Sequence, residues 1–331
     1  MVEYVKVPGM DIQVSRIGVG TWAIGGWMWG GTHQELAVKA LLKAFDMGLN
    51  LVDTAPVYGF GLSESIVGRA LKEYGEKDRI VIATKVGLEW TPEGKVCRNS
   101  SKERIMKEVE DSLRRLGRDY IDIYQVHWPD PKVPIEETAQ AMHELYRQGK
   151  IRAIGVSNYS PQQMETFRSV APLHVCQPPY NLFEREIEKD VLPYCEEKQI
   201  LMLFYGAICR GLLSGKINKD SKFSGDDLRQ IDPKFQEPRF SQYLRALEEL
   251  NRFAQERYGK RVIHLAVRWL LEKSPLGVAL WGVRKPEHLQ DLPEVFGWKI
   301  SQEDMQEIDR IIEKYVKDPV GPEFMAPPIH C

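Results

Sequence analysis

Eight short apolar segments alternate with helix-like stretches along this chain, and this alternation restricts the fold more than any other feature. The segments are RIGVGTW, NLVDTA, RIVIATKV, YIDIYQVHW, IRAIGVSN, HVCQPPYN, ILMLFYG and GVALWGV. Nearly continuous apolar strands separated by helices predict a parallel sheet that helices cover. Eight such units favour a closed (β/α)8 barrel, a TIM barrel of the α/β class, over the competing architecture, a doubly wound open sheet.

The rest of the chain fits a barrel of ordinary size. No low-complexity linker divides the 331 residues, so we expect residues 1–331 to form a single domain. The opening YVKVPGMDIQVSR holds a Pro-Gly turn between two extended runs, which predicts a β-hairpin that caps the bottom of the barrel. Residues 214–240 are the longest irregular stretch, and loops of that length are usually functional lids or disordered.

Composition excludes several classes of partner and location. The formal net charge of −2 and the isoelectric point near 6.4 argue against nucleic acid or an anionic membrane as a partner. We expect neither export nor a membrane span, because no apolar run is long enough for either. An odd number of cysteines without C-x-x-C spacing predicts reduced thiols and a cytoplasmic location. These cysteines are Cys97, Cys176, Cys195, Cys209 and Cys331.

Four chemically reactive side chains occur where three successive strands end: Asp53, Tyr58, Lys85 and His127. Catalytic groups of such barrels come from the carboxyl ends of different strands. A phenol has a reference pKa of about 10, and the ammonium of Lys85 would lower the pKa of Tyr58 if the two were neighbours. Asp53 would make a buried ammonium tolerable, and His127 could hydrogen-bond a substrate oxygen.

Each of these residues alone also has an ordinary structural explanation. Asp53 could cap a turn, Tyr58 could be a loop aromatic, Lys85 a strand-end lysine and His127 a core histidine. Their order at successive strand ends favours a site that donates a proton. A different barrel chemistry, in which Lys85 forms a Schiff base as in a lyase, is the weaker alternative.

The sequence resembles the aldo-keto reductase family over nearly its whole length. LVDTAPVYGFGLSESIVGRAL, IATKVG, YIDIYQVHWPDP, KIRAIGVSNYS, QPPYNLFER, GLLSGK and WGVRKPEHL are similar to the successive signatures of that family. Within the family, these segments are most similar to the bacterial AKR11 branch of general-stress and inositol-related reductases, which lies near the potassium-channel β-subunits. The resemblance implies reduction of aldehydes or ketones by NADPH. It makes Tyr58 the proton donor, Asp53 and Lys85 its pKa-setting pair, and His127 the carbonyl-orienting group.

The resemblance also implies an NADPH/NADP+ site without a Rossmann domain. GVGTWA formally matches the dinucleotide fingerprint, but IGGWMWGG follows it where a helix would be needed. On the nicotinamide side the implied contacts are Thr21, Trp22, Asp53, Ser157, Asn158, Gln177 and the stacking residue Tyr205. On the pyrophosphate side they are Gly206, Ala207, Ile208, Cys209, Arg210, Lys216 and Arg229, and the last of these places residues 214–240 on the cofactor side. Around the 2′-phosphate they are Gly282, Val283, Arg284, Lys285, Pro286 and His288.

Several of these contacts have simpler explanations, namely strand-end capping for Ser157, Asn158 and Gln177 and solvated surface charge for the basic residues. His288 and Asp291 stand where much of the branch carries Gln and Asn, which leaves the adenine contacts open.

The expected partner is a small carbonyl substrate, because Trp22, Trp27, Trp29 and Trp128 would line an apolar mouth. We expect no metal site, and a monomer is plausible. The alternative from a different class of protein is an NADPH-binding regulatory or redox-sensing subunit whose catalysis is vestigial.

Overall fold

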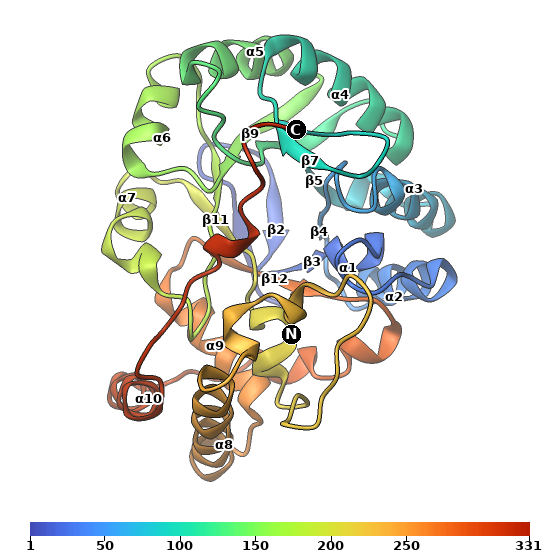
Figure 1. Ribbon diagram of the computed structural model, residues 1–331. Helices are drawn as coiled ribbons and strands as arrows, with labels where there is room; N and C mark the ends of the chain where they lie inside the picture. Colours follow the sequence, from blue (N-terminus) through green and yellow to red (C-terminus); the bar gives the residue numbers. More distant parts are fainter.

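The computed structural model describes residues 1–331 and contains the expected closed barrel of eight parallel strands (Figure 1). The strands are β3 (Ile17–Gly20), β4 (Leu51–Asp53), β5 (Val81–Val86), β8 (Ile121–Val126), β9 (Ile151–Ser157), β10 (Val175–Gln177), β11 (Leu201–Phe204) and β12 (Gly277–Gly282). Neighbours in the chain pair with one another, and β12 closes the barrel against β3. Each apolar segment of the sequence supplies one strand, so the barrel prediction is confirmed.

Helices surround the barrel, as the amphipathic stretches between the strands predict (Figure 1). They are α2 (Gln34–Asp46), α3 (Leu62–Tyr74), α4 (Lys102–Leu116), α5 (Ile135–Arg147), α6 (Pro161–Arg168), α7 (Val191–Glu197), α8 (Arg239–Tyr258), α9 (Val262–Lys273) and α10 (Gln302–Tyr315). A further short helix, α1 (Trp22–Gly25), follows β3 directly. No helix has the length and apolar character that crossing a bilayer requires.

An N-terminal hairpin closes the bottom of the barrel. Its strands β1 (Tyr4–Lys6) and β2 (Gln13–Ser15) pair in antiparallel fashion. Val7, Ile12 and Val14 pack in one cluster with side chains from the barrel interior, among them Leu51 and Ile123. Burial of this apolar cluster seals the end of the barrel opposite the cavity.

Three insertions shape the opposite end of the barrel. A second hairpin, β6 (Leu88–Trp90) and β7 (Val96–Arg98), follows β5. The loop of residues 214–240 contains two 3-10 turns, Leu228–Gln230 and Pro233–Phe235, and Asp226 in this loop accepts hydrogen bonds from the N–H groups of Met28 and Gly30. The C-terminal segment, residues 316–331, crosses the mouth of the barrel toward β7 (red in Figure 1).

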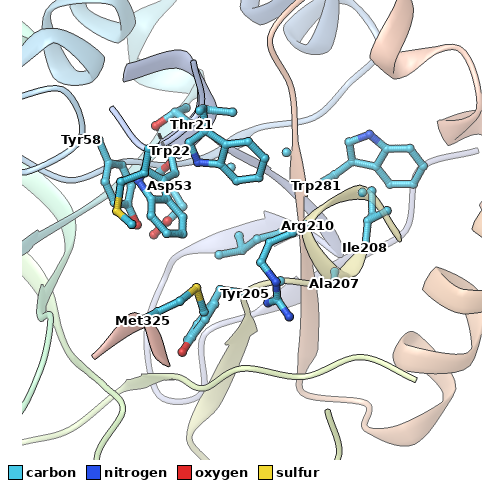
Figure 2. Close-up of a pocket in the computed structure, with 18 of the residues that line it drawn as sticks. Thr21, Trp22, Asp53, Tyr58, Tyr205, Ala207, Ile208, Arg210, Trp281 and Met325 are labelled. Carbon is cyan, nitrogen blue, oxygen red and sulfur yellow. Dashed lines mark hydrogen bonds between the residues drawn. The ribbon is translucent and has the colours of Figure 1, made fainter. Parts of the chain in front are cut away.

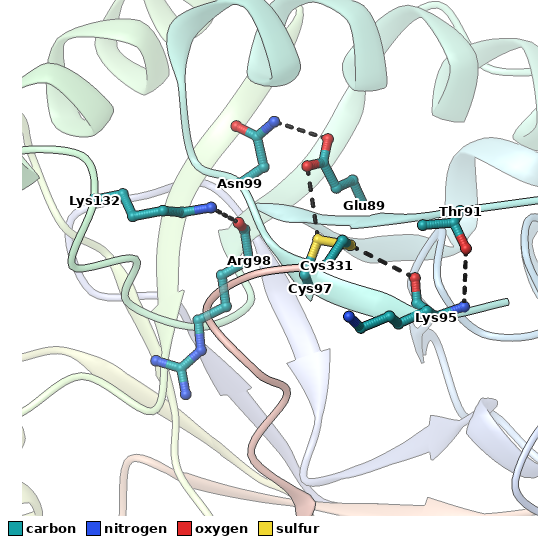
Figure 3. Close-up of a disulfide and its surroundings, with 8 residues drawn as sticks. All are labelled: Glu89, Thr91, Lys95, Cys97, Arg98, Asn99, Lys132 and Cys331. Carbon is teal, nitrogen blue, oxygen red and sulfur yellow. Dashed lines mark hydrogen bonds between the residues drawn. A yellow bond between two sulfur atoms is a disulfide. The ribbon is translucent and has the colours of Figure 1, made fainter.

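The prediction that all five cysteines are reduced is wrong. Cys97 in β7 and Cys331 form a disulfide with a Cα–Cα distance of 5.2 Å (Figure 3). Cys176, Cys195 and Cys209 are free and buried. An odd number of cysteines allows one bridge, and a separation of 234 residues leaves no local pattern by which the sequence could reveal it.

Candidate active site

The main cavity opens at the carboxyl ends of the barrel strands and has a volume of about 540 Å³. Figure 2 shows Tyr58, Trp22 and Asp53 on one side of it and Tyr205 with Met325 on another. The four tryptophans expected at an apolar mouth, Trp22, Trp27, Trp29 and Trp128, all line it. A cavity of this size and position is where a barrel enzyme binds its ligands.

Lys85 and Asp53 form a buried ion pair below this cavity. Lys85 Nζ donates to Asp53 Oδ2 at 2.7 Å and to the carbonyl oxygen of Thr54 at 2.9 Å. Burial lowers the pKa of Lys85, and the Asp53 carboxylate opposes that effect. Lys85 Nζ also lies 5.1 Å from the centre of the Tyr58 ring, so the predicted neighbours are together.

Tyr58 is held by a close approach of two backbone segments. A Cβ atom on Gly25 would lie 2.5 Å from the carbonyl group of Tyr58, and one on Gly59 would lie 2.2 Å from the carbonyl oxygen of Gly25. Gly59 also has a φ of +65°, which glycine adopts without strain. The Trp22 ring stacks on the Tyr58 ring with centroids 5.8 Å apart, and the His127 ring meets it edge-on, also at 5.8 Å. The phenol therefore has a fixed place on the cavity wall.

The electrostatics of Tyr58 differ from the sequence-based expectation. Burial raises the pKa of Tyr58 well above its usual value, and the Asp53 charge acts in the same direction. The nearby Lys85 ammonium, which donates to Asp53 and Thr54, does not outweigh these two effects, so the pKa of Tyr58 is not lowered as the sequence predicted. Tyr58 is consequently protonated at neutral pH and has a proton to give.

His127 lies at the end of β8 on the same wall. Burial lowers the pKa of His127 well below its usual value, and the positive charge of Lys85 lowers it further. The imidazole is therefore neutral at pH 7, and a neutral ring can donate or accept one hydrogen bond at each nitrogen but is a poor acid.

Gln125 in β8 belongs to this site and was missed in the sequence. Gln125 Nε2 donates to Asp53 Oδ1 at 3.3 Å, and Gln177 Nε2 donates to the same oxygen at 2.8 Å. Gln177 Nε2 also donates to Gln125 Oε1 at 3.1 Å. Gly155 in β9 makes room for this side chain, since a Cβ atom there would lie 2.7 Å from Gln125 Cγ. Asp53 is thus held by an ammonium and two amides.

The polar residues at the ends of β9, β10 and β11 form a connected network beside Gln177. Ser157 Oγ donates to the carbonyl oxygen of Gln177 at 2.8 Å. Asn158 Nδ2 donates to the carbonyl oxygen of His127 at 3.0 Å, and Tyr205 Oη donates to Asn158 Oδ1 at 2.8 Å. Asn158 has a positive φ of 62°, and in this conformation its amide contacts the end of the neighbouring strand β8 at His127. Thr21, by contrast, uses its hydroxyl to donate to the carbonyl oxygen of Asp53 at 2.9 Å and so joins β3 to β4.

The opposite end of the cavity is basic. Lys216, Arg229 and Arg284 line it, as do Asp291 and His288. Burial lowers the pKa of Arg284, and the neighbouring Arg229 charge lowers it further. Arg229 is paired with Asp227, with its Nη2 atom 2.5 Å from Asp227 Oδ2, whereas Arg284 makes no ion pair. An anion beside Arg284 would be stabilised by its guanidinium group.

Polar groups line the cavity both near Gln177 and near Arg284. Besides the basic end, the buried Nε1 atom of Trp29 has no hydrogen-bond partner although this residue lines the cavity, so it can donate to a ligand oxygen. The Arg229 guanidinium lies 5.4 Å from the centre of the Trp29 ring.

Some residues that the resemblance implied are placed differently. Arg210 reaches the cavity wall, but its guanidinium is buried and pairs with Glu184 and Asp232, so it is committed to the protein. Gly206, Ala207, Ile208 and Gly282 line the cavity. Cys209, Val283, Lys285 and Pro286 lie within two residues of lining residues in the sequence but do not line the cavity themselves.

Several further apolar residues line the cavity and were not expected from the sequence, among them two pairs from distant segments. Leu88 and Val96 come from the β6–β7 hairpin, and Met325 and Pro327 come from the C-terminal segment. None of these four lies at the end of a barrel strand. The rule that predicts Asp53 and His127, namely that site residues lie at strand ends, therefore does not predict them. They form a wall that only the folded chain assembles.

The fold and the cavity together are those of a barrel enzyme, with polar side chains at the carboxyl ends of the strands. The sequence model of the aldo/keto reductase family matches residues 16–313, and the chain belongs to that family. It is therefore an oxidoreductase that uses NADPH to reduce carbonyl groups.

Relatives cover almost the whole chain. The aldo-keto reductase YhdN of Bacillus subtilis is 57% identical over 326 residues, which are 98% of this chain and 98% of the relative. An Escherichia coli protein named NADH-specific methylglyoxal reductase is 35% identical over 321 residues, covering 92% of this chain and 97% of the relative. The structure of the glycerol dehydrogenase AKR11B4 from Gluconobacter oxydans is similar with a TM-score of 0.89 and 53% identity, over 98% of this chain and 99% of that one.

Proposed function

We propose that Tyr58 is the general acid of carbonyl reduction and that His127 orients the substrate. The observation that carries this assignment is the contrast between two neighbouring groups. Tyr58 keeps its proton at neutral pH, whereas His127 is neutral and has no acidic proton to give easily. With the rings in contact, a carbonyl oxygen between them can accept a hydrogen bond from each.

NADPH supplies the hydride to the carbonyl carbon when it is bound. As the carbonyl oxygen gains electron density, Tyr58 transfers its proton to that oxygen and becomes a phenolate. The buried ammonium of Lys85, 5.1 Å from the Tyr58 ring, stabilises the negative charge that develops there. Asp53 keeps Lys85 charged in a buried position, since its carboxylate opposes the effect of burial.

The same cavity suggests how the cofactor is held. The carboxamide of the nicotinamide would be bound by Ser157, Asn158 and Gln177, with Tyr205 beside the ring. Lys216 and Arg229 would bind the pyrophosphate, and Arg284 the 2′-phosphate. Lys216 is the weaker pyrophosphate ligand, because its Nζ atom lies 3.6 Å from Asp291 Oδ2 and its charge is partly compensated there. Arg210 is not proposed as a phosphate ligand.

The apolar wall favours small aromatic or aliphatic carbonyl substrates. Trp22, Trp27 and Trp128 pack with Tyr58, Leu88 and Val96 in one apolar cluster at the mouth. We also propose that residues 1–331 work as a single domain, which one closed barrel supports. The monomeric state and the cytoplasmic location stay predictions.

Steady oxidation of NADPH with a panel of aldehydes tests the proposed function. Multiple turnovers with butanal or benzaldehyde are expected. A protein that binds NADPH tightly but gives at most one turnover with every aldehyde would instead be a regulatory or redox-sensing subunit.

A further inference from the structure

The C-terminal segment forms part of the cavity wall. Met325 and Pro327 of this segment line the cavity, and Met325 lies beside Tyr205 (Figure 2). The cavity shape at the substrate end therefore depends on where residues 316–331 are held.

The beginning of the segment is anchored by side chains of α8 and of the loop before it. Lys234 Nζ donates to the carbonyl oxygen of Gly321 at 3.1 Å, and the N–H group of Val320 donates to Tyr243 Oη at 3.3 Å. Lys234 and Tyr243 are both fully buried. These contacts precede the part that lines the cavity, so they hold the start of the segment without fixing its end.

The end of the segment is held by the β6–β7 hairpin. The N–H group of Arg98 donates to the carbonyl oxygen of Pro328 at 3.2 Å, and Arg98 Nε donates to that of Pro327 at 3.0 Å. The residue before Arg98 is Cys97, whose disulfide with Cys331 is the covalent tie between hairpin and segment (Figure 3). If the disulfide is broken, the two hydrogen bonds from Arg98 still connect the hairpin to the end of the segment.

The surroundings of the disulfide also suit two thiols. Cys97 Sγ lies 3.7 Å from Glu89 Oε1, and Cys331 Sγ lies 3.7 Å from the carbonyl oxygen of Lys95 (Figure 3). A disulfide sulfur has no hydrogen to donate, so both contacts become S–H hydrogen bonds only after reduction. Cys97 is buried whereas Cys331 is an exposed residue, so we expect an external thiol to approach the disulfide from the side of Cys331.

We propose that the Cys97–Cys331 disulfide is a redox-responsive determinant of substrate size. While it is intact, it holds the C-terminal segment against the cavity. After reduction, Met325 and Pro327 withdraw and the cavity accepts bulkier carbonyl compounds. The inference rests on the proposed function, because it takes this cavity to be the carbonyl site.

The reductant in this step is a dithiol. One of its thiolates attacks Cys331 Sγ, the bond between the two protein sulfurs breaks, and Cys97 leaves as a thiolate that takes up a proton. The second thiol of the reductant then attacks the reductant's own first sulfur, which is now bonded to Cys331 Sγ. This attack releases Cys331 as a thiol and closes the reductant's disulfide. Two electrons pass to the protein, and the dithiol becomes a disulfide.

Thiol counting on the unfolded protein establishes the two states. After mild oxidation with oxidised dithiothreitol, three titratable thiols are expected, those of Cys176, Cys195 and Cys209. After reduction the count is expected to be five, which is the number of cysteines in the chain. A count of five under both conditions would overturn the proposal.

The kinetic experiment compares oxidised and reduced protein with butanal and with the bulkier 2-naphthaldehyde. Reduction is expected to raise the ratio of kcat/KM for 2-naphthaldehyde to that for butanal at least about tenfold, the lower end of the range that shape alone gives an apolar pocket. The matched control, Cys331→Ser, is expected to show the ratio of the reduced protein with or without reductant. A ratio that is the same in both redox states would overturn the proposal, as would an equal response to reductant in Cys331→Ser.

Hydrogen exchange tests the movement independently of turnover. Backbone amides of residues 322–331 are expected to exchange faster in the reduced protein and in Cys331→Ser than in the oxidised protein. Equal exchange in all three would contradict the proposal. Absence of turnover with both aldehydes in every state would count against the proposed function instead, and the exchange experiment would still decide whether the disulfide holds the segment.

Discussion

Lys85 Nζ lies 2.7 Å from Asp53 Oδ2, and both side chains are buried at the base of the cavity. Removal of one partner leaves a buried charge without its counter-charge, which typically costs about 3–5 kcal/mol. We expect Asp53→Asn and Lys85→Met each to lower the free energy of unfolding and to reduce turnover. Urea unfolding of the double variant is the check, because its loss of stability should be clearly smaller than the sum of the two single losses. Additive losses would contradict the pairing.

Gln125 should act as a positioning residue, since it touches Asp53 and Gln177 but does not line the cavity. Gln125→Leu removes a donor to Asp53 and an acceptor from Gln177, and each lost hydrogen bond is worth about 0.5–1.5 kcal/mol. We expect kcat to fall and NADPH binding to weaken by up to about tenfold.

Gln125→Glu separates the two contacts of this residue. It keeps the oxygen that accepts from Gln177 but replaces the amide that donates to Asp53. Fluorescence titration should show NADPH affinity largely restored in Gln125→Glu, while steady-state kinetics should show kcat still reduced. Equal loss of affinity in both variants would count against the contact with Gln177.

Arg284 should distinguish NADPH from NADH, because only NADPH carries the 2′-phosphate. Arg284→Ala is expected to weaken NADPH by about tenfold to a hundredfold, the value of a charge-assisted hydrogen bond, and to leave NADH nearly unchanged. Arg284 Nη1 also donates to the carbonyl oxygen of Trp29 at 3.0 Å, so NADH serves as the control for a disturbed loop. Arg229→Ala should weaken both cofactors alike. If Arg284→Ala weakened NADH as much as NADPH, the discriminating role would belong elsewhere, with His288 and Asp291 the next residues to test.

The lowered pKa of His127 links stability to pH. In the unfolded chain this histidine titrates near 6.5, so below that pH the unfolded state binds the proton more readily than the folded state. The neutral imidazole therefore contributes stability above pH 6.5, and this contribution is lost as the pH falls below 6.5, by up to about 1.4 kcal/mol at pH 5.5. Urea unfolding at pH 7.5 and 5.5 should show a smaller loss for His127→Gln than for wild type. An identical loss in the two proteins would contradict a buried neutral His127.

The fold could be predicted from the sequence because a barrel repeats one local signal. Each strand is an apolar segment followed by a helix, so the eight strands and the N-terminal hairpin were found from their patterns. Individual positions were less reliable. Ser63, for example, is a residue type that often caps a helix, but its hydroxyl donates to Thr21 Oγ1 at 2.8 Å and α3 begins one residue earlier at Leu62.

The candidate site was predictable where its residues follow strands and unpredictable where distant segments meet. Asp53, Lys85 and His127 follow strand ends, so topology alone brings them together. Gln125 left a signal that was overlooked, a polar residue within the apolar strand YIDIYQV. Met325, Pro327 and the disulfide depend on a contact between β7 and the C-terminal segment, which no local pattern encodes.

Turnover of Tyr58→Phe tests the central claim most directly. The substitution removes only the phenolic oxygen and its proton, so NADPH affinity should be unchanged while kcat for an aldehyde falls by about 10² to 10⁴-fold, the usual contribution of a general acid. A Tyr58→Phe enzyme that binds NADPH normally and keeps more than about a third of the wild-type kcat would show that another group donates the proton.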